Sequence, residues 1–165
     1  MAAENALTQL TEKFVLINEK GHIPSLVNLL VENCNRFGLL DDRDRMRIQV
    51  ALEEALLNAV VHGNLEVSSR LRELEGDLFE QAIAERKLIE PYRSRRVTLI
   101  ANYTHTEARF TIRDEGPGFD VTKVRNPTED DAIALASGRG ILLMRSFMDE
   151  VEYSNKGNEV SMVKR

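Results

Sequence analysis

Short apolar stretches, several with alternating apolar and polar residues, are distributed over the chain in the manner of strands with one buried face. They are "KFVLIN" (13–18), "RVTLIANY" (96–103) and "ARFTIRD" (108–114), and a polar turn at 104–107 joins the last two. Near the end, "EVEYSN" (150–155) and "NEVSMVKR" (158–165) predict a hairpin around Gly157. The pattern therefore predicts five strands, four of them in the second half of the chain.

Apolar residues at helical spacing predict two helices in the first half of the chain. Pro24 opens the first helix, which ends near Phe37, and Gly38 closes it. The second helix runs from about Asp42 to Val61 and ends at Gly63. A third helix is expected to begin in the glycines of "GRGILLMRSFMDEV" (138–151).

Residues 66–96 form a highly charged segment between the second helix and the strands. Its leucines at 71, 74 and 78 predict an amphipathic helix that Gly76 interrupts, with a new capping box at "DLFE" (77–80). We interpret the segment as a solvated helical cover over the edge of the sheet in preference to a docking arm. Residues 1–12 are expected to be a tail, and residues 121–137 a long polar loop.

Helices gathered first and strands later predict an α+β fold, a two-layer sandwich, in preference to a doubly wound sheet. The 165 residues suffice for one domain, 1–165, with its own core. Apolar residues make up 42% and charged residues 30%, and the net charge of −5 disfavours nucleic acid as a direct partner. The single cysteine, Cys34, excludes an internal disulfide. Because no apolar run approaches a membrane span and no signal peptide is visible, we expect a cytoplasmic protein without membrane contact.

The predicted second helix carries one narrow polar stripe in otherwise apolar surroundings. Nine of the twelve residues at 50–61 are apolar, while Glu54, Asn58 and His62 are spaced i, i+4, i+8. The amide oxygen of Asn58 can serve Mg²⁺, which prefers oxygen ligands and bridges phosphates. Glu54, one turn earlier, can then take a proton as a general base. The alternative is a helix with a thin solvated face.

The stretch "RDEGPGFD" (113–120) places Asp114 directly after a predicted strand. At the floor of a pocket, this carboxylate can accept a hydrogen bond from an amine such as that of adenine. Gly116 and Gly118 allow the backbone to pass close to a ligand, although the same residues are typical of an ordinary turn. The segment "SGRG", Ser137, Gly138, Arg139 and Gly140, precedes a helix whose free N–H groups suit phosphate oxygens. Its alternative is a capped glycine loop.

In combination, "EALLNAVVHGN", "DEGPGF" and "SGRGILLMRSFMDEVEY" carry a family resemblance. Over residues 14–165 the chain resembles the GHKL (Bergerat-fold) ATPases. Within them it is most similar to the bacterial anti-sigma factor serine/threonine protein kinases. The resemblance implies a mixed, mostly antiparallel sheet covered by helices on one face.

The resemblance also implies roles for the candidate residues. Glu54 would be the general base, Asn58 the Mg²⁺ ligand and Asp114 the acceptor for the adenine amine of ATP. Gly116 and Gly118 would shape the pocket, residues 121–137 would form an ATP lid, and Gly138, Arg139 and Gly140 would line the phosphates. His62 belongs to the same motif, either at the nucleotide or as a structural residue.

Two functions in different classes follow from the resemblance. The first is a kinase that phosphorylates an anti-sigma factor antagonist and so regulates a sigma factor; these two proteins, and a second copy of the chain in a homodimer, are the expected partners. The second is an ATP-binding regulatory module without kinase activity. A histidine kinase catalytic domain is disfavoured because no two-helix dimerisation segment with a phosphoacceptor histidine is visible.

Overall fold

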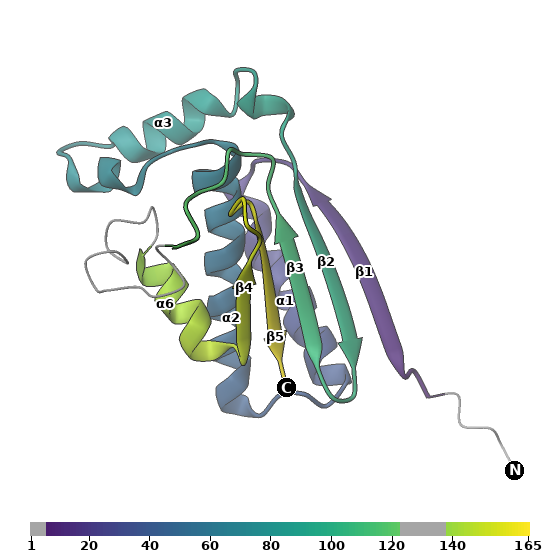
Figure 1. Ribbon diagram of the computed structural model, residues 1–165. Coiled ribbons are helices and arrows are strands. Elements are labelled where there is room, and N and C mark those ends of the chain that lie inside the picture. The colour runs from purple at the N-terminus through teal and green to yellow at the C-terminus, as the bar shows by residue number, and fades with distance from the viewer. Residues whose placement is uncertain (1–5, 123–137) are drawn as a thin grey trace, which may run out of the picture.

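The computed structural model of the protein describes residues 6–122 and 138–165. Its centre is a five-stranded sheet in the order β1-β2-β3-β5-β4 (Figure 1). The strands are β1 (Gln9–Leu16), β2 (Val97–Thr104), β3 (Ala108–Arg113), β4 (Glu150–Tyr153) and β5 (Glu159–Lys164). Every neighbouring pair is antiparallel. The α+β prediction is therefore confirmed, while the mixed sheet that the resemblance implied is antiparallel throughout the described residues.

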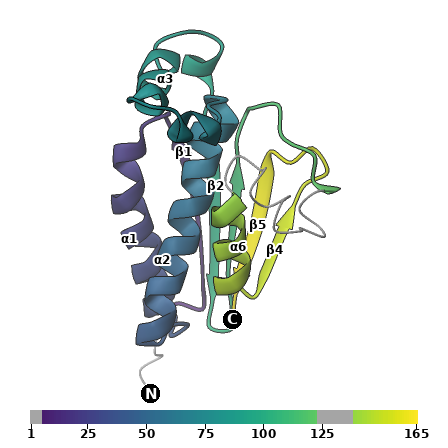
Figure 2. The same ribbon diagram turned by 90° about the vertical axis from the view of Figure 1, so that its left-hand side faces the viewer.

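Four α-helices accompany the sheet among the described residues. They are α1 (Ile23–Arg36), α2 (Asp42–Leu57), α3 (Leu78–Arg86) and α6 (Gly138–Phe147). Short 3₁₀ turns lie at η1 (Lys20–His22), η3 (Ser69–Glu73) and η4 (Tyr92–Ser94). Figure 2 shows α1, α2 and α6 side by side on one face of the sheet. None of the described helices has the length and apolar character that a membrane crossing requires.

The core lies between the sheet and these helices, and the sequence pattern explains it. Residues of β2 alternate between buried and half-buried, so that Leu99 and Tyr103 face the helices with no exposed surface. From the helical layer, Leu30 and Leu52 are equally buried against them. Because only one face of the sheet is fully covered, the strands alternate in the way that made them recognisable in the sequence.

The ends of the helices are set by local chemistry. Gly38 has a φ of 72°, the left-handed conformation that commonly ends a helix, and it follows α1. Asp41 caps α2, since its side chain accepts a hydrogen bond of 2.7 Å from the backbone N–H of Asp44. This hydrogen bond lowers the pKa of the Asp41 carboxyl. Asp77, in contrast, makes no side-chain capping bond, so the predicted capping box at 77–80 does not form.

Several boundaries differ from the prediction. The third helix ends at Phe147, and residues 150–151 belong to β4. The expected tail 1–12 includes the start of β1, where Glu12 on the half-buried side and Val15 on the exposed side interrupt the alternation of apolar and polar residues. The second helix does not run as an α-helix to Val61. It changes after Leu57 into a π-helical turn, η2 (Asn58–Asn64), in which the hydrogen bond from Leu65 N–H to Val60 O spans five residues.

The charged segment 66–96 lies beyond the end of α2 (Figure 1). It is attached there by ion pairs between Lys87 and Glu19, at 2.9 Å, and between Lys20 and Glu80, at 2.8 Å. Figure 1 shows α3 above the helical layer and away from both edge strands. The segment is therefore a cover for the end of the helices, and the interpretation as a cover over the sheet edge is wrong.

Candidate functional site

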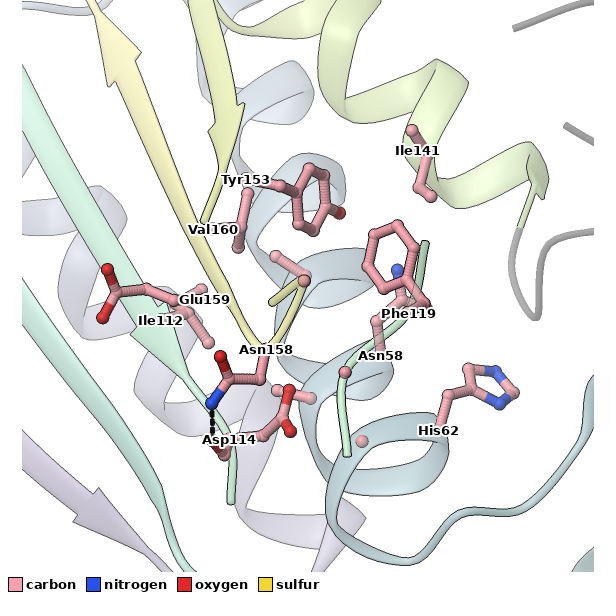
Figure 3. Close-up of a pocket in the computed structure, with 15 residues that line it drawn as sticks. Asn58, His62, Ile112, Asp114, Phe119, Ile141, Tyr153, Asn158, Glu159 and Val160 are labelled. Carbon is pink, nitrogen blue, oxygen red and sulfur yellow. Dashed lines mark hydrogen bonds between the residues drawn. The ribbon is translucent and has the colours of Figure 1, made fainter. Parts of the chain in front are cut away.

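A cavity opens between the end of α2, the sheet and the start of α6 (Figure 3). Asn58 and His62 reach it from the π-helical turn, and Asp114 reaches it from the end of β3. Its walls are otherwise largely apolar, with contributions from Ala55, Ala59, Ile112, Phe119, Ile141, Tyr153 and Val160. A mostly apolar cavity with a few convergent polar groups is the usual form of a small-molecule site.

Asp114 is held rigidly at one end of this cavity. Its backbone N–H donates to Asn158 O at 2.9 Å, and its backbone oxygen accepts from Asn158 Nδ2 at 3.0 Å (Figure 3). The N–H of Gly116 donates to Asp114 Oδ1 at 2.8 Å. This bond engages one position on a carboxylate that has about four acceptor positions, so Asp114 can also accept from a ligand.

Burial also changes the ionisation of Asp114. The residue is 8% exposed, and desolvation raises the pKa of its carboxyl to about 6. The Gly116 N–H, Lys156 and Arg95 act in the opposite direction without cancelling the shift. At neutral pH the folded protein therefore maintains a buried carboxylate that is costly in free energy, an arrangement typical of functional sites.

Two glycines allow Asp114 to contact the helix. A Cβ atom on Gly63 would lie 2.4 Å from Asp114 Cγ, and one on Gly116 would lie 2.2 Å from Gly63 O. Gly118 has a φ of 77°, and its Cβ would lie 1.9 Å from Lys156 O. These contacts explain why "HGN" and "DEGPG" carry glycine at these positions.

We expect Gly63→Ala to destabilise the protein, because Asp114 or the π-helical turn must move to make room. Overpacking of this kind typically costs about 1–3 kcal/mol. Denaturant unfolding measures the loss. Gly21→Ala is the matched control, since a Cβ there meets nothing within 4 Å. Equal stability of Gly63→Ala and wild type would contradict the tight contact.

The polar stripe of the second helix reaches the cavity only in part. Asn58 and His62 line it, whereas Glu54 is half-buried one turn earlier and does not. Burial raises the pKa of the Glu54 carboxyl, and the charges of Arg72 and Arg139 oppose that shift. A raised pKa suits a general base, so Glu54 lies beside the cavity with the required chemistry.

The side chain of His62 is held in place by a hydrogen bond and by a ring contact. Its Nδ1 lies 2.6 Å from Val67 O, and its ring packs at a tilt against Phe79 with centroids 6.3 Å apart. Burial lowers the pKa of the imidazole, so the neutral form, with Nδ1–H donating to Val67 O, predominates at pH 7. Nε2 is then left as the acceptor of the ring.

The structure describes part of the third motif, "SGRG" (137–140). Gly138, Arg139 and Gly140 form the first turn of α6, and the next residue, Ile141, lines the cavity. Arg139 is exposed at this end of the helix. Ser137 lies outside the described residues. The same holds for the expected lid 121–137 apart from its first two residues.

Asn64 is a structural member of the site that the sequence did not single out. It is fully buried, and its Oδ1 accepts the N–H of Glu115 at 2.7 Å. Its Nδ2 donates to Asn18 Oδ1 at 2.8 Å. Asn64 therefore ties the π-helical turn to the loop after Asp114. The sequence feature that could have identified Asn64 is its position at the end of "VVHGN", two residues beyond His62.

An aromatic pair was also missed. Phe119 and Tyr153 meet edge to face with ring centroids 5.1 Å apart, and both line the cavity (Figure 3). Phe119 is fixed by its N–H, which donates to Lys156 O at 3.1 Å. Phe119 stands within the "DEGPGF" motif, but Tyr153 comes from β4, and only the fold brings the two together.

The described residues contain no group of three or more His, Cys, Asp and Glu side chains that could hold a metal ion. Asn58 supplies a neutral amide oxygen at the cavity, on the side of the π-helical turn. This donor set fits a hydrated Mg²⁺ that takes its other ligands from water and from phosphate oxygens.

Comparison with known proteins agrees with the site. Individually curated proteins give no match to the chain. The family described as "Histidine kinase-like ATPase domain" matches it over residues 17–164, a range that includes β2 to β5, the four described α-helices and all three motifs. Since this match covers most of the chain, the protein belongs to the histidine kinase-like ATPase domain family.

Proposed function

We propose that the protein binds Mg-ATP in the cavity at Asp114 and transfers the γ-phosphoryl group to a serine or threonine of an anti-sigma factor antagonist. The observation that carries the proposal is the convergence of Asp114 and Asn58 on one cavity in a member of an ATPase family. Such a protein would act in the cytoplasm and, through its antagonist partner, would control the release or capture of a sigma factor.

Adenine recognition is assigned to Asp114. Its carboxylate accepts from the exocyclic amine of the base, while the apolar walls of the cavity receive the ring. Gly63, Gly116 and Gly118 leave room for the close backbone and side-chain contacts that hold Asp114 and its loop at the cavity. The buried position of the carboxylate makes this hydrogen bond strong, because water does not compete for it.

The phosphates are assigned to the other end of the cavity. The N–H groups at the start of α6, in Gly138, Arg139 and Gly140, suit phosphate oxygens, and Ser137 precedes them in the sequence. Asn58 would hold Mg²⁺, which neutralises phosphate charge when bound. His62, neutral and fixed by Val67, is assigned a structural role.

Glu54 is assigned the proton transfer. The hydroxyl oxygen of the substrate attacks the γ-phosphorus while Glu54 takes its proton, and the bond between the γ-phosphorus and the bridging oxygen breaks to release ADP. The raised pKa of the Glu54 carboxyl supports this role because it makes the group a better base.

A second candidate function is an ATP-switched binding module that phosphorylates nothing. One observation favours it: Glu54 does not line the cavity. In that case ATP would control the affinity for a sigma factor, for the antagonist or for a second copy of the chain. Incubation with radiolabelled ATP and the proteins recovered with the chain separates the two functions by the presence or absence of phosphorylated product.

Asn58→Ala is expected to weaken ATP binding only when Mg²⁺ is present. Wild type should lose affinity when the metal is chelated, and the variant should show little difference between the two conditions, because the amide oxygen is its proposed ligand. Calorimetric titration with and without chelator measures this. Asn28→Ala, on the exposed side of α1, is the control. Equal Mg²⁺ dependence in both variants would remove Asn58 from the metal site.

A further inference from the structure

The charged segment 66–96 begins with a turn that is built into the site. Glu66 has a φ of 52°, which is unusual for a residue other than glycine. The turn is fixed by Arg86, which donates to the backbone oxygens of both Leu65, at 2.7 Å, and Glu66. Arg95 pairs with the Glu66 carboxylate at 2.8 Å. The chain after His62 is thus directed back over the end of α2.

Phe79 then provides a platform next to the cavity. It is 7% exposed and packs against His62, which lines the cavity. The guanidinium of Arg72 lies over the Phe79 ring, 4.2 Å from its centroid. A guanidinium that stacks by its face on an aromatic ring keeps its N–H edge available for oxygen acceptors.

Arg72 and its neighbour Arg70 differ from the other arginines of this segment, and of these two only Arg72 lies over an aromatic ring in the described residues. Arg86 and Arg95 donate to backbone oxygens, and Arg93 pairs with Glu90. Within residues 6–122 and 138–165, in contrast, no hydrogen bond or ion pair of the Arg72 side chain is found. A cation held on Phe79, beside the His62 wall of the cavity, whose donors have no partner among the described residues, is suited to an anionic ligand.

The charge of Arg72 acts on the proposed reaction centre. It lowers the pKa of the Glu54 carboxyl and also that of His62, so both groups lie within its field. Arg139, at the start of α6, lowers the pKa of Glu54 as well. Two cations from separate parts of the chain therefore act on Glu54, which lies one turn before Asn58.

We propose that Arg72 is a phosphate-binding residue of the nucleotide site, which donates its N–H edge to the terminal phosphate of ATP while its face rests on Phe79. The inference rests on the proposed ATP binding. With adenine at Asp114, the phosphates extend past Asn58 towards Glu54, where Arg72 and Arg139 supply positive charge. The segment 66–96 then contributes directly to the nucleotide site as well as covering the helices.

The test compares Arg72→Gln with Arg70→Gln, since both arginines are exposed in the same 3₁₀ turn but only Arg72 lies over Phe79. Calorimetry gives the affinity of each variant for ATP, ADP and adenosine in the presence of Mg²⁺. Loss of a charge-assisted hydrogen bond predicts that Arg72→Gln weakens ATP binding by about 10- to 100-fold. ADP should be affected much less, adenosine should bind as in wild type, and Arg70→Gln should match wild type throughout.

Each other outcome has a distinct meaning. Wild-type ATP affinity in Arg72→Gln would overturn the inference while leaving ATP binding in place. An equal loss for ATP, ADP and adenosine, together with a lower melting temperature, would also overturn it, because Arg72 would then only support Phe79. If wild type itself bound none of the three, the proposed function would fail first.

Discussion

Glu54→Gln is expected to retain Mg-ATP binding and to lose phosphoryl transfer to the antagonist protein. Binding should survive because Glu54 does not line the cavity. Transfer should fall by about 100- to 10,000-fold, the usual contribution of a general base, because the amide cannot take the proton of the attacking hydroxyl. Radiolabelled ATP with purified partner measures the rate, and calorimetry measures the affinity.

Glu53→Gln is the matched control. Glu53 is the adjacent residue of α2, and successive side chains on a helix point about 100° apart. Its carboxylate accepts a hydrogen bond from Gln49 at 3.2 Å, so its position is occupied by a contact within the helix. Transfer should be nearly intact in this variant. Similar losses in both variants would show a general effect on the helix, and Glu54 would lose its assignment as the base.

Asp114→Asn is expected to weaken ATP binding and to stabilise the nucleotide-free protein. The variant keeps the shape of the side chain but replaces one acceptor with a donor that faces the adenine amine. A lost buried hydrogen bond predicts an affinity loss on the order of 1–3 kcal/mol. At the same time, the variant removes a buried charge, so its free energy of unfolding at pH 7 should rise by a similar order.

The pH dependence of stability gives the sign of this effect independently. Because burial raises the pKa of Asp114 from 3.8 to about 6, the folded protein binds a proton more tightly than the unfolded chain does. The carboxyl therefore contributes stability below about pH 4 that is lost as the pH rises through 6. Thermal melts should show the gap between Asp114→Asn and wild type opening over this range. A gap that is constant with pH would contradict the raised pKa.

Much of the fold and of the site could be predicted because short, local sequence patterns determine them. The alternation in β2 and β3 follows from one covered face, so these strands lie within about a residue of their predicted limits. Asp114, Gly116 and Gly118 stand in one stretch after a strand, and the geometry of that stretch brings the first and last of them to the cavity.

The rest depends on contacts between distant residues, which local patterns do not encode. The π-helical turn has the same apolar composition as an α-helix, and it is set by the hydrogen bonds of Asn64 to Asn18 and Glu115. Tyr153 becomes part of the cavity only because β4 lies on the outer side of β5. The charged segment could not be placed, because its ion pairs with Glu19 and Lys20 cross long stretches of chain.

The wide turn at Asn58–Asn64 has a consequence for protein engineering. Since each residue of an α-helix advances the direction of the side chain by about 100°, deleting one residue here to restore a regular helix would rotate everything that follows. Gly63 would no longer face the Asp114 carboxyl, and a bulkier side chain would take its place. A chimera that exchanges α2 with a related domain should therefore be joined after Asn64, so that the helix and its wide turn are transferred as one unit.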